Sequence, residues 1–241
     1  MIKKVAASVT AATPSAVSSG KPRSTPKAEE TRRRILQAAL DLFQEKGFVE
    51  TTIREIARKA SVATGAAYYY FPSKEAIVMA FYAQTQEEMW ELTRKPMAEG
   101  SDLRARLKAI LDLKFGQLKP YQRALGAVFA NAADPAGSIS PFGDQTRAIR
   151  DQSIRIFREA LEGSDVRIPI DLADPLPRLL WLYHMGLILF WIHDRSPRQK
   201  RTEALMDRSL DLIVRLLRVS RFRILAPLRK AALELLRSVE G

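Results

Sequence analysis

The sequence predicts an all-α protein with an N-terminal three-helix helix-turn-helix unit and a larger C-terminal helical domain. Apolar residues recur at helical spacing along the 241-residue chain, and neither strand-like alternation nor an Asn-Gly hairpin signal interrupts them. Hydrophobic residues make up 46% of the chain, which suffices for a packed core. The chain has no cysteine and 2 histidines, so disulfides, thiolate metal sites and histidine-based triads have little support.

The excess positive charge, +12 in total, lies at the two ends of the chain. Residues 1–34 hold 8 basic and 2 acidic side chains, residues 195–241 hold 12 and 5, and the middle holds 19 and 20. Basic ends favour a polyanion such as nucleic acid or an anionic membrane surface, and a solvated tail is the alternative. Residues 1–29 are rich in Ala, Ser and Pro without a strongly apolar run, so we expect a disordered basic arm and not an export signal.

Two short helices are predicted after a longer first helix. Apolar residues share one face of a helix over 30–46, and Gly47 ends it. Thr52 and Glu55 have the spacing of a capping box and start the second helix. The third helix spans 63–70 after a tight break. Such a tight turn between two short helices is typical of a helix-turn-helix unit.

Longer helices are predicted for the rest of the chain. Ser73 is suited to cap a helix over 74–95. Further helices are expected over residues 101–118, 120–132, 141–161, 178–194, 198–219 and 221–238. Segments rich in small residues and proline predict loops over 131–143 and 163–177.

Several short motifs follow one another between residues 31 and 82. They are the segment from Thr31 to Phe43, Gly47-Phe48, the segment from Thr51 to Ala57, Gly65, the segment from Tyr68 to Phe71, and Ser73-Lys74-Glu75. In these motifs the chain resembles the tetracycline-repressor (TetR) family of bacterial regulators. The resemblance implies a helix-turn-helix DNA-binding domain over 30–75 and a helical ligand-binding and dimerisation domain over 76–241.

The predicted recognition helix places two small side chains toward DNA. A recognition helix meets base edges near its N-terminus and phosphates along its sides. Thr64 is therefore a candidate for a hydrogen bond to a base, and Ala66 for contact with a thymine methyl group. Plain exposure to solvent is the alternative for each of them.

Three adjacent tyrosines follow on the same helix. Neighbours on a helix lie about 100° apart, so Tyr68, Tyr69 and Tyr70 cannot all face a core. Packing in the core is the alternative for any one of them. The resemblance implies that Tyr68 touches a base or a phosphate. It further implies that Tyr69, Tyr70 and Lys74 bind the DNA backbone, and that Thr52 lies where a helix N-terminus meets a phosphate.

Four positions depart from the family pattern. Ser61 stands where a glycine usually adopts positive φ, and an L-residue there costs about 1–2 kcal/mol. Ala63 replaces the serine that usually caps the recognition helix, Tyr70 replaces a histidine and Ala67 replaces a leucine. The operator sequence therefore does not follow from the family pattern.

The strongest apolar run spans 179–192. Its 14 residues are fewer than the roughly 20 that cross a bilayer, and Arg178 and Asp194 flank it. A helix that is apolar all round is buried in a core or against a second subunit. The resemblance implies that the last two long helices pack with those of a second copy, so a charge at Leu187 or Leu189 should break the dimer.

The resemblance also implies that a small effector binds among the helices of 76–241. The aromatic and histidine candidates for its pocket are Trp90, Phe115, Phe129, Trp181, His184 and Phe190. Core packing is the alternative for each, since aromatic residues at helical spacing usually belong to a core. No carboxylate or second histidine lies four residues from His184, so we predict no metal site, and we predict no cofactor.

Together these features predict a cytoplasmic, homodimeric, one-component transcription regulator. We expect a repressor that binds a palindromic operator in double-stranded DNA, is released by a small-molecule effector and has no membrane partner. A TetR-like activator and a non-specific DNA-packaging protein are the alternatives. An enzyme is not predicted, because the chain lacks Gly-x-Ser-x-Gly, His-Glu-x-x-His and Gly-x-x-x-x-Gly-Lys motifs.

Overall fold

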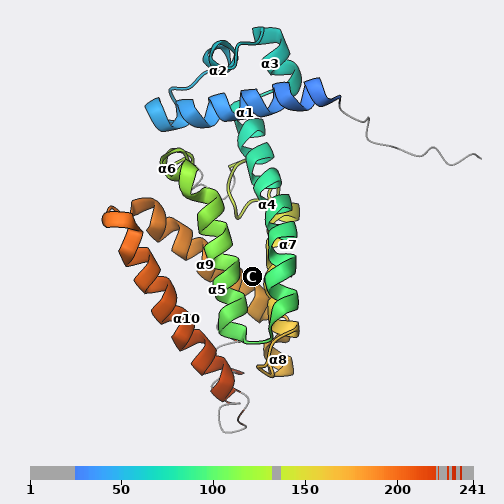
Figure 1. The fold of residues 1–241 in the computed structure, drawn as a ribbon, viewed down its shortest axis with the longest axis vertical. Helices are drawn as coiled ribbons and strands as arrows, with labels where there is room; N and C mark the ends of the chain where they lie inside the picture. The colour runs from blue at the N-terminus through green and yellow to red at the C-terminus, as the bar shows by residue number, and fades with distance from the viewer. Residues whose placement is uncertain are drawn as a thin grey trace, which may run out of the picture.

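Helices make up the regular structure of this chain. The computed structural model describes residues 25–131 and 137–220, together with positions 222, 227, 230, 231 and 234. These residues contain helices and no strand, which confirms the predicted all-α fold. Helices α1 to α3 lie at one end of an elongated molecule, and the remaining helices form a bundle below them (Figure 1). Residues 1–24 of the predicted arm and most of the helix predicted over 221–238 lie outside the described residues.

The first helix begins earlier than the sequence pattern indicates. Helix α1 spans Pro26–Lys46, so residues 26–29, which were assigned to the arm, belong to it. Thr25 caps it by accepting a hydrogen bond from the amide of Ala28, and Pro26 fits the first turn because no backbone donor is needed there. Gly47 ends it at φ 91°, a conformation that favours glycine.

The helix-turn-helix unit follows the predicted capping chemistry. Helix α2 spans Ile53–Lys59, and both hydrogen bonds of the capping box between Thr52 and Glu55 are present. Helix α3 spans Thr64–Tyr70 and begins at Ala63 without a side-chain cap. Helix α4 spans Lys74–Glu99, longer than predicted, and Ser73 caps it through the amide of Ala76.

The turn between α2 and α3 contains the predicted positive-φ serine. Ser61 has φ 55°, although a residue with a Cβ atom is disfavoured there. The guanidinium of Arg34 on α1 donates hydrogen bonds to the carbonyl oxygens of Ala60 and Ser61. The turn is therefore held from outside by α1.

Replacing Ser61 with glycine should stabilise the protein by about 0.5–1 kcal/mol. The change removes a left-handed backbone cost of about 1–2 kcal/mol, and the greater freedom of glycine in the unfolded chain offsets part of the gain. Thermal and urea unfolding measure the difference. Ser61→Ala is the matched control, because it keeps the Cβ atom. Equal stability of the glycine and alanine variants would contradict the assignment of strain to this residue.

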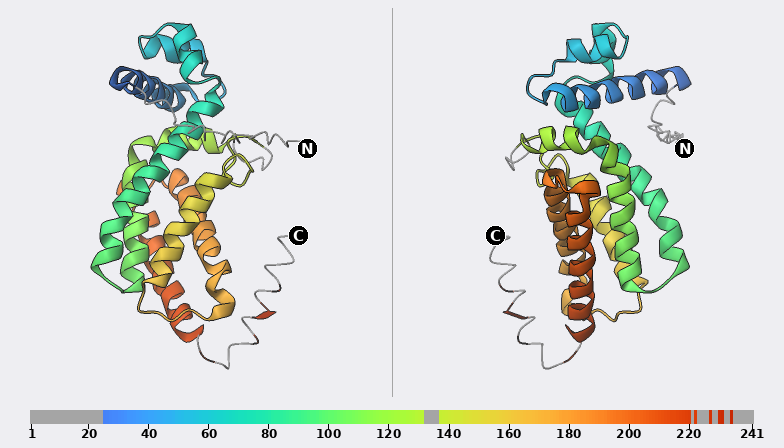
Figure 2. Two further views of the ribbon diagram at one scale, coloured as in Figure 1. Left: turned by 90° about the vertical axis from the view of Figure 1, so that its right-hand side faces the viewer. Right: turned by 60° about the vertical axis from the view of Figure 1, so that its left-hand side comes forward.

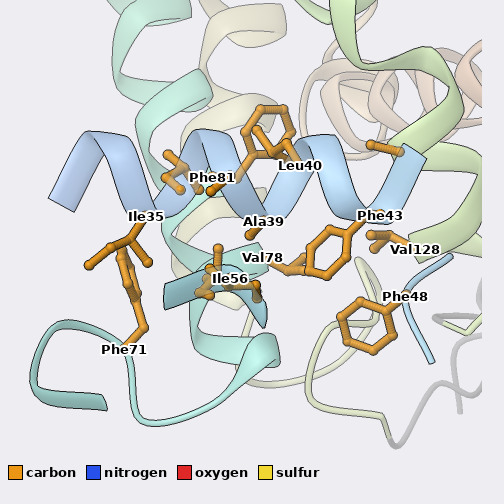
Figure 3. Packing of buried hydrophobic residues seen from close by; sticks show 14 of the residues in the cluster. Ile35, Ala39, Leu40, Phe43, Phe48, Ile56, Phe71, Val78, Phe81 and Val128 are labelled. Atoms are coloured by element: carbon orange, nitrogen blue, oxygen red, sulfur yellow. The ribbon is translucent and has the colours of Figure 1, made fainter. Parts of the chain in front are cut away.

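The first hydrophobic core joins the helix-turn-helix unit to the bundle. Figure 3 shows Ile35 of α1 beside Phe71, and Phe43 beside Phe48, whose ring centroid lies 5.1 Å away. Val128 of α6 belongs to the same cluster of buried residues. The domain boundary predicted at residue 75 therefore falls in the first turn of α4, and the core continues across it.

The bundle contains longer helices around a second core. Its elements are α5 (Leu103–Leu118), the 3-10 helix η1 (Lys119–Tyr121), α6 (Gln122–Phe129), α7 (Arg147–Glu162), α8 (Ile170–Ala173), α9 (Pro175–His193), the 3-10 helix η2 (Pro197–Gln199) and α10 (Lys200–Ser220). Helices α9 and α10 lie side by side (Figure 2). Buried residues of α4, α5, α7, α9 and α10, together with Val166 after α7, make up the second core, and Trp181 and Leu210 are among them.

Two predicted boundaries in the bundle are wrong. The helix predicted from residue 141 begins at Arg147, because the hydroxyl of Thr146 donates to the carbonyl oxygens of Ser140 (2.7 Å) and Gly143 (3.0 Å) and stabilises a loop before it. The loop predicted over 163–177 contains α8 and the start of α9. Two prolines lie in the first turn of α9, where missing amide donors cost nothing.

Arg106 joins three helices at the end of the bundle remote from α1. Its buried guanidinium donates to the carbonyl oxygens of Met97 (2.6 Å) and Gly100 (2.6 Å), at the end of α4. It also donates to the carbonyl oxygen of Glu159 on α7 (3.3 Å). These charge-assisted hydrogen bonds hold the ends of α4 and α7 against the start of α5.

Candidate nucleic-acid interface and ligand cavity

Helix α3 lies at the outer end of the molecule (Figure 1). Thr64, at its first turn, is exposed, whereas Ala66 is half-buried and Ala67 is buried in the first core. The small Ala67 lets α3 pack closely on that core. One face of α3 is thereby fixed inward, and the face that carries Thr64 remains outward.

The three tyrosines take different environments, as the helical geometry requires. Tyr69 is 83% exposed and Tyr68 is 49% exposed, while Tyr70 is half-buried at the edge of the first core. The rings of Tyr69 and Tyr70 meet edge to face, with centroids 5.3 Å apart. Two phenol groups are therefore presented to solvent along one side of α3.

Lys74 has a structural role that the sequence reasoning missed. Its ammonium group donates to the carbonyl oxygens of Phe48 (2.7 Å) and Val49 (2.9 Å) and lies 4.8 Å from the centre of the Phe48 ring. These contacts join the start of α4 to the segment between α1 and α2. An ammonium group has three hydrogens, and two of them are used in these hydrogen bonds.

Thr52 lies in a small charged network at the start of α2. Its hydroxyl donates to a carboxylate oxygen of Glu55 (2.7 Å), and Lys46 lies 2.6 Å from the same oxygen. The hydrogen bond with Lys46, followed by those with Thr52, lowers the pKa of Glu55 to about 2. The Thr52 side chain is thus exposed but engaged by Glu55.

A cavity of about 90 Å³ lies among α4, α5, α6, α7 and α9. Three of the six residues predicted for a ligand pocket line it: Phe129, Trp181 and His184. The pocket draws its aromatic side chains from α4, α6 and α9, because Phe81 and Tyr82 of α4 also line it. These two residues were not predicted from the sequence as part of the pocket.

The other three predicted pocket residues lie outside the cavity lining. Trp90 faces the guanidinium of Arg155, which lies 5.8 Å from its ring. Phe115 packs against Trp191, with centroids 5.6 Å apart, and Phe190 is exposed on α9. Helical spacing places all three on α4, α5 or α9 but does not say which side of each helix faces the cavity.

Seven polar residues of the cavity lining were not predicted, and four of them bear on what the cavity can bind. Tyr82 and Gln86 come from α4, Lys114 from α5 and Ser153 from α7. The hydroxyl of Ser153 donates to the side-chain oxygen of Gln86 (2.6 Å). The spacing of Lys114 from buried apolar residues at 107, 110, 111 and 118 was the available signal, because it places a lysine on the buried face of α5.

Burial changes the acid–base properties of two cavity residues. It lowers the pKa of the Lys114 ammonium to about 8, although the charge of Glu88 opposes the change. Burial, and then the positive charge of Lys114, lowers the pKa of His184 to about 3. At neutral pH the cavity thus holds a cationic lysine and a neutral histidine.

An apolar face runs along α9 and α10. Its exposed side chains are Leu182, Leu189, Phe190, Leu205, Leu212, Leu216 and Val219. On α10 they recur at spacings of seven, four and three residues, which makes one stripe, and on α9 Leu182 and Leu189 lie seven residues apart with Phe190 next to Leu189. We call these seven residues the apolar face.

The two leucines singled out in the predicted dimer helix have different positions. Leu189 is 51% exposed on the apolar face, whereas Leu187 is 3% exposed and packs in the second core. A charge at Leu187 would therefore test folding and not dimerisation. Within the described residues α9 is the one helix long and apolar enough to span a membrane, and 44% of that span is buried.

The fold and the exposed helix α3 define a DNA-binding regulator of the helix-turn-helix class. The family model described as "Bacterial regulatory proteins, tetR family" matches residues 35–81. A second, "Tetracyclin repressor-like, C-terminal domain", matches residues 106–233, which is more than half of the chain. The chain belongs to the TetR family of transcriptional regulators.

Curated relatives match over part of the chain. The transcriptional regulator UidR of Escherichia coli K12 is 37% identical over 70 residues, 29% of this chain and 36% of UidR. SrpR of Pseudomonas putida is 44% identical over 62 residues, 26% of this chain and 29% of SrpR. The transcriptional repressor KstR2 of Rhodococcus jostii is 33% identical over 84 residues, 35% of this chain and 41% of KstR2. The chain thus spans less than half the length of these relatives.

Solved structures extend the likeness to the bundle. The fatty acid degradation regulator FadR from Bacillus halodurans superposes with a TM-score of 0.61 at 18% identity, covering 78% of this chain and 96% of that chain. FadR from Bacillus subtilis in complex with stearoyl-CoA gives a TM-score of 0.60 at 18% identity, covering 76% and 97%. At these identities the likeness concerns the fold alone.

Proposed function

We propose that this protein is a cytoplasmic, homodimeric repressor that binds a palindromic operator and leaves it when a small-molecule effector binds. The observation that carries the proposal is the placement of α3, whose exposed Thr64, Tyr68 and Tyr69 lie at one end of the molecule. A helix presented in this way fits a DNA major groove. The proposed contacts are those predicted above: Thr52, Thr64, Ala66, Tyr68, Tyr69, Tyr70 and Lys74.

The apolar face supports the dimer. Soluble monomers rarely expose contiguous apolar stripes, so a partner surface is expected. A second copy offers the same apolar face, and a two-fold interface needs such a self-complementary surface. Two copies paired in this way place two α3 helices on one DNA duplex, which accounts for a palindromic operator.

Helix α4 supports a link between effector and DNA. It carries Lys74 beside the DNA-binding unit and Tyr82 and Gln86 at the cavity. A ligand that favours one position of α4 changes the spacing of the two α3 helices. Such a ligand shifts the equilibrium toward the dimer that does not match the operator.

Operator selectivity tests the function. Genome-wide footprinting identifies the operator, and gel shifts then compare it with random DNA of the same length. We expect the operator to bind at least about 10³-fold more tightly than random DNA. A packaging protein would show little preference, and that result would overturn the proposal. Reporter expression in a deletion strain separates a repressor, whose loss raises expression, from an activator, whose loss lowers it.

Tyr69 and Thr64 should differ in what they contribute to DNA binding. Tyr69→Phe removes a hydroxyl from the most exposed tyrosine of α3 and should weaken operator and random DNA alike, by about three- to tenfold. Thr64→Val should instead change which base is preferred at one operator position. Binding to a library of single-base operator variants measures both. A changed base preference in Tyr69→Phe would show that the two roles are wrongly assigned.

A further inference from the structure

The cavity combines an apolar wall with polar side chains on two sides. Its apolar lining includes Phe81, Leu118, Leu125, Phe129, Trp181 and Ile188. Tyr82 and Gln86 contribute polar groups from α4, and Lys114 and His184 contribute them from α5 and α9. A ligand that fits must therefore have one polar end and an apolar body.

Several polar atoms of the cavity lack a partner. The Tyr82 hydroxyl, the Gln86 side-chain nitrogen and both ring nitrogens of His184 have no hydrogen bond within the described part of the chain. The side chains of Gln86 and His184 are more than nine-tenths buried. Buried polar groups are nearly always hydrogen-bonded, so these groups indicate a missing partner. The Gln86 amide nitrogen can only donate and the Tyr82 phenol can also donate, so a partner with acceptor atoms satisfies both.

Lys114 fixes the sign of the partner's charge. Its side chain is more than nine-tenths buried, and among the described residues its ammonium group makes one hydrogen bond, a long one to the side-chain oxygen of Gln117 (3.4 Å). Among the described residues no carboxylate lies within ion-pair distance of it. The carboxylate of Glu88, which acts on it from α4, accepts a hydrogen bond from the Gln117 nitrogen (2.8 Å). A buried cation without a paired anion favours an anionic ligand.

The other cation of the lining is already engaged. Arg150 donates to the carbonyl oxygens of Pro141 (3.0 Å) and Gly143 (3.1 Å), and its guanidinium lies 5.9 Å from the centre of the Trp181 ring. It is half-buried, unlike Lys114. The cavity therefore offers one buried charge to a ligand, which suits a monoanion better than a dianion.

We propose that the cavity binds a small apolar monocarboxylic acid, with Lys114 paired to the carboxylate and Tyr82 and Gln86 donating hydrogen bonds to it. The volume of about 90 Å³ is smaller than the roughly 150 Å³ of an engineered cavity that takes up benzene, so the apolar body is a short chain and not a ring. This inference rests on the proposed function, because it names the chemical class of the effector.

Matched acids and amides test the charge requirement. Butanoate and pentanoate are titrated into the full-length protein by calorimetry beside butanamide and pentanamide, with acetate and phosphate as polar controls. We expect the two acids to bind at least about tenfold more tightly than their amides, because the hydrogen bonds are to a charged group. Acetate and phosphate should bind weakly or not at all. Equal affinities for acids and amides would overturn the proposal, as would binding of neither acid.

A lysine exchange tests the residue. Lys114→Met should lower the affinity for butanoate and pentanoate at least about tenfold and leave the amides unchanged. Lys108→Met is the matched control on the same helix, because Lys108 is paired with Asp112 (2.8 Å) outside the cavity. Unchanged acid binding in a folded Lys114→Met protein would overturn the assignment. If that variant does not fold, the acid and amide comparison in the unaltered protein decides the question alone.

Operator binding separates this inference from the function on which it rests. A protein without operator preference in the absence of acid would refute the proposed function. A protein that selects its operator but neither binds these acids nor is released by them would refute the ligand class alone. Release of the operator by butanoate or pentanoate, reduced at least about tenfold in Lys114→Met, supports both.

Discussion

Replacing Leu189 and Leu216 together with glutamate is expected to give a folded monomer with at least about a hundredfold lower operator affinity. Both side chains lie on the apolar face, one on α9 and one on α10, and both are exposed in the single chain. Four charges brought into a two-fold interface would repel one another and would have to be desolvated. A monomer then loses the gain of about 10²–10⁴ that comes from binding two half-sites at once.

Sedimentation and gel shifts on the same samples measure this effect. Ile170→Glu is the matched control, because Ile170 is a highly exposed apolar residue on α8, outside the apolar face. That control should remain dimeric and bind the operator as the unaltered protein does. A double variant that stays dimeric at micromolar concentration would place the interface elsewhere on the molecule.

Acidification from pH 7 to pH 4 should lower the free energy of unfolding by about 3 kcal/mol through His184 alone. In the fold the pKa of His184 is lowered to about 3, first by burial and then by the charge of Lys114. In the unfolded chain it has its ordinary value of 6.5, so protons bind the unfolded state first. The stabilisation is complete above pH 6.5 and is lost as the pH falls toward 3. Each pKa unit in this range is worth about 1.4 kcal/mol.

Urea unfolding of the unaltered protein and of His184→Phe at several pH values isolates this contribution. Other groups also destabilise the fold in acid, and Asp194 is one of them. Burial raises the pKa of its carboxyl, but hydrogen bonds from Ser196 and Thr202 outweigh burial and lower it below the ordinary value. The difference between the two proteins is therefore the quantity of interest. The surface change His193→Phe controls for the loss of a histidine. Parallel stability curves for the unaltered protein and His184→Phe would contradict the assignment.

Local rules account for most of the fold that the sequence predicted. Helix caps depend on residues only a few positions apart, so the sequence alone predicts them. Examples are the N-caps at Thr52 and Ser73 and the end of α1 at Gly47. The start of α7 depends on Thr146 and Arg150 binding loop carbonyls, a tertiary arrangement that no periodic pattern records. The predicted start of this helix was therefore wrong, because side chains outside the loop stabilise the loop before it.

The cavity was predicted less well than the DNA-binding unit for a related reason. Their aromatic side chains identified Trp181 and Phe129 correctly as cavity residues. Trp90 is also aromatic, but it lies outside the cavity beside Arg155. Which side of each long helix faces the cavity depends on how five helices pack together. Lys114 was the one sequence signal for the polar end of the cavity. It is a charged residue at a position on the apolar side of α5 where the spacing predicts an apolar one.

The hydrogen bonds of Arg106 give α4 a fixed pivot. They hold its last turns at Met97 and Gly100, while the cavity touches it at Gln86 and the DNA-binding unit at Lys74. At 1.5 Å per residue, Gln86 lies about 16 Å from Met97 and Lys74 about 34 Å. A rigid helix that turns about this pivot therefore doubles, at Lys74, any sideways displacement imposed at Gln86. A change in side-chain packing of about 1 Å around a ligand would move the DNA-binding end by about 2 Å, and each subunit of a dimer would add its own displacement.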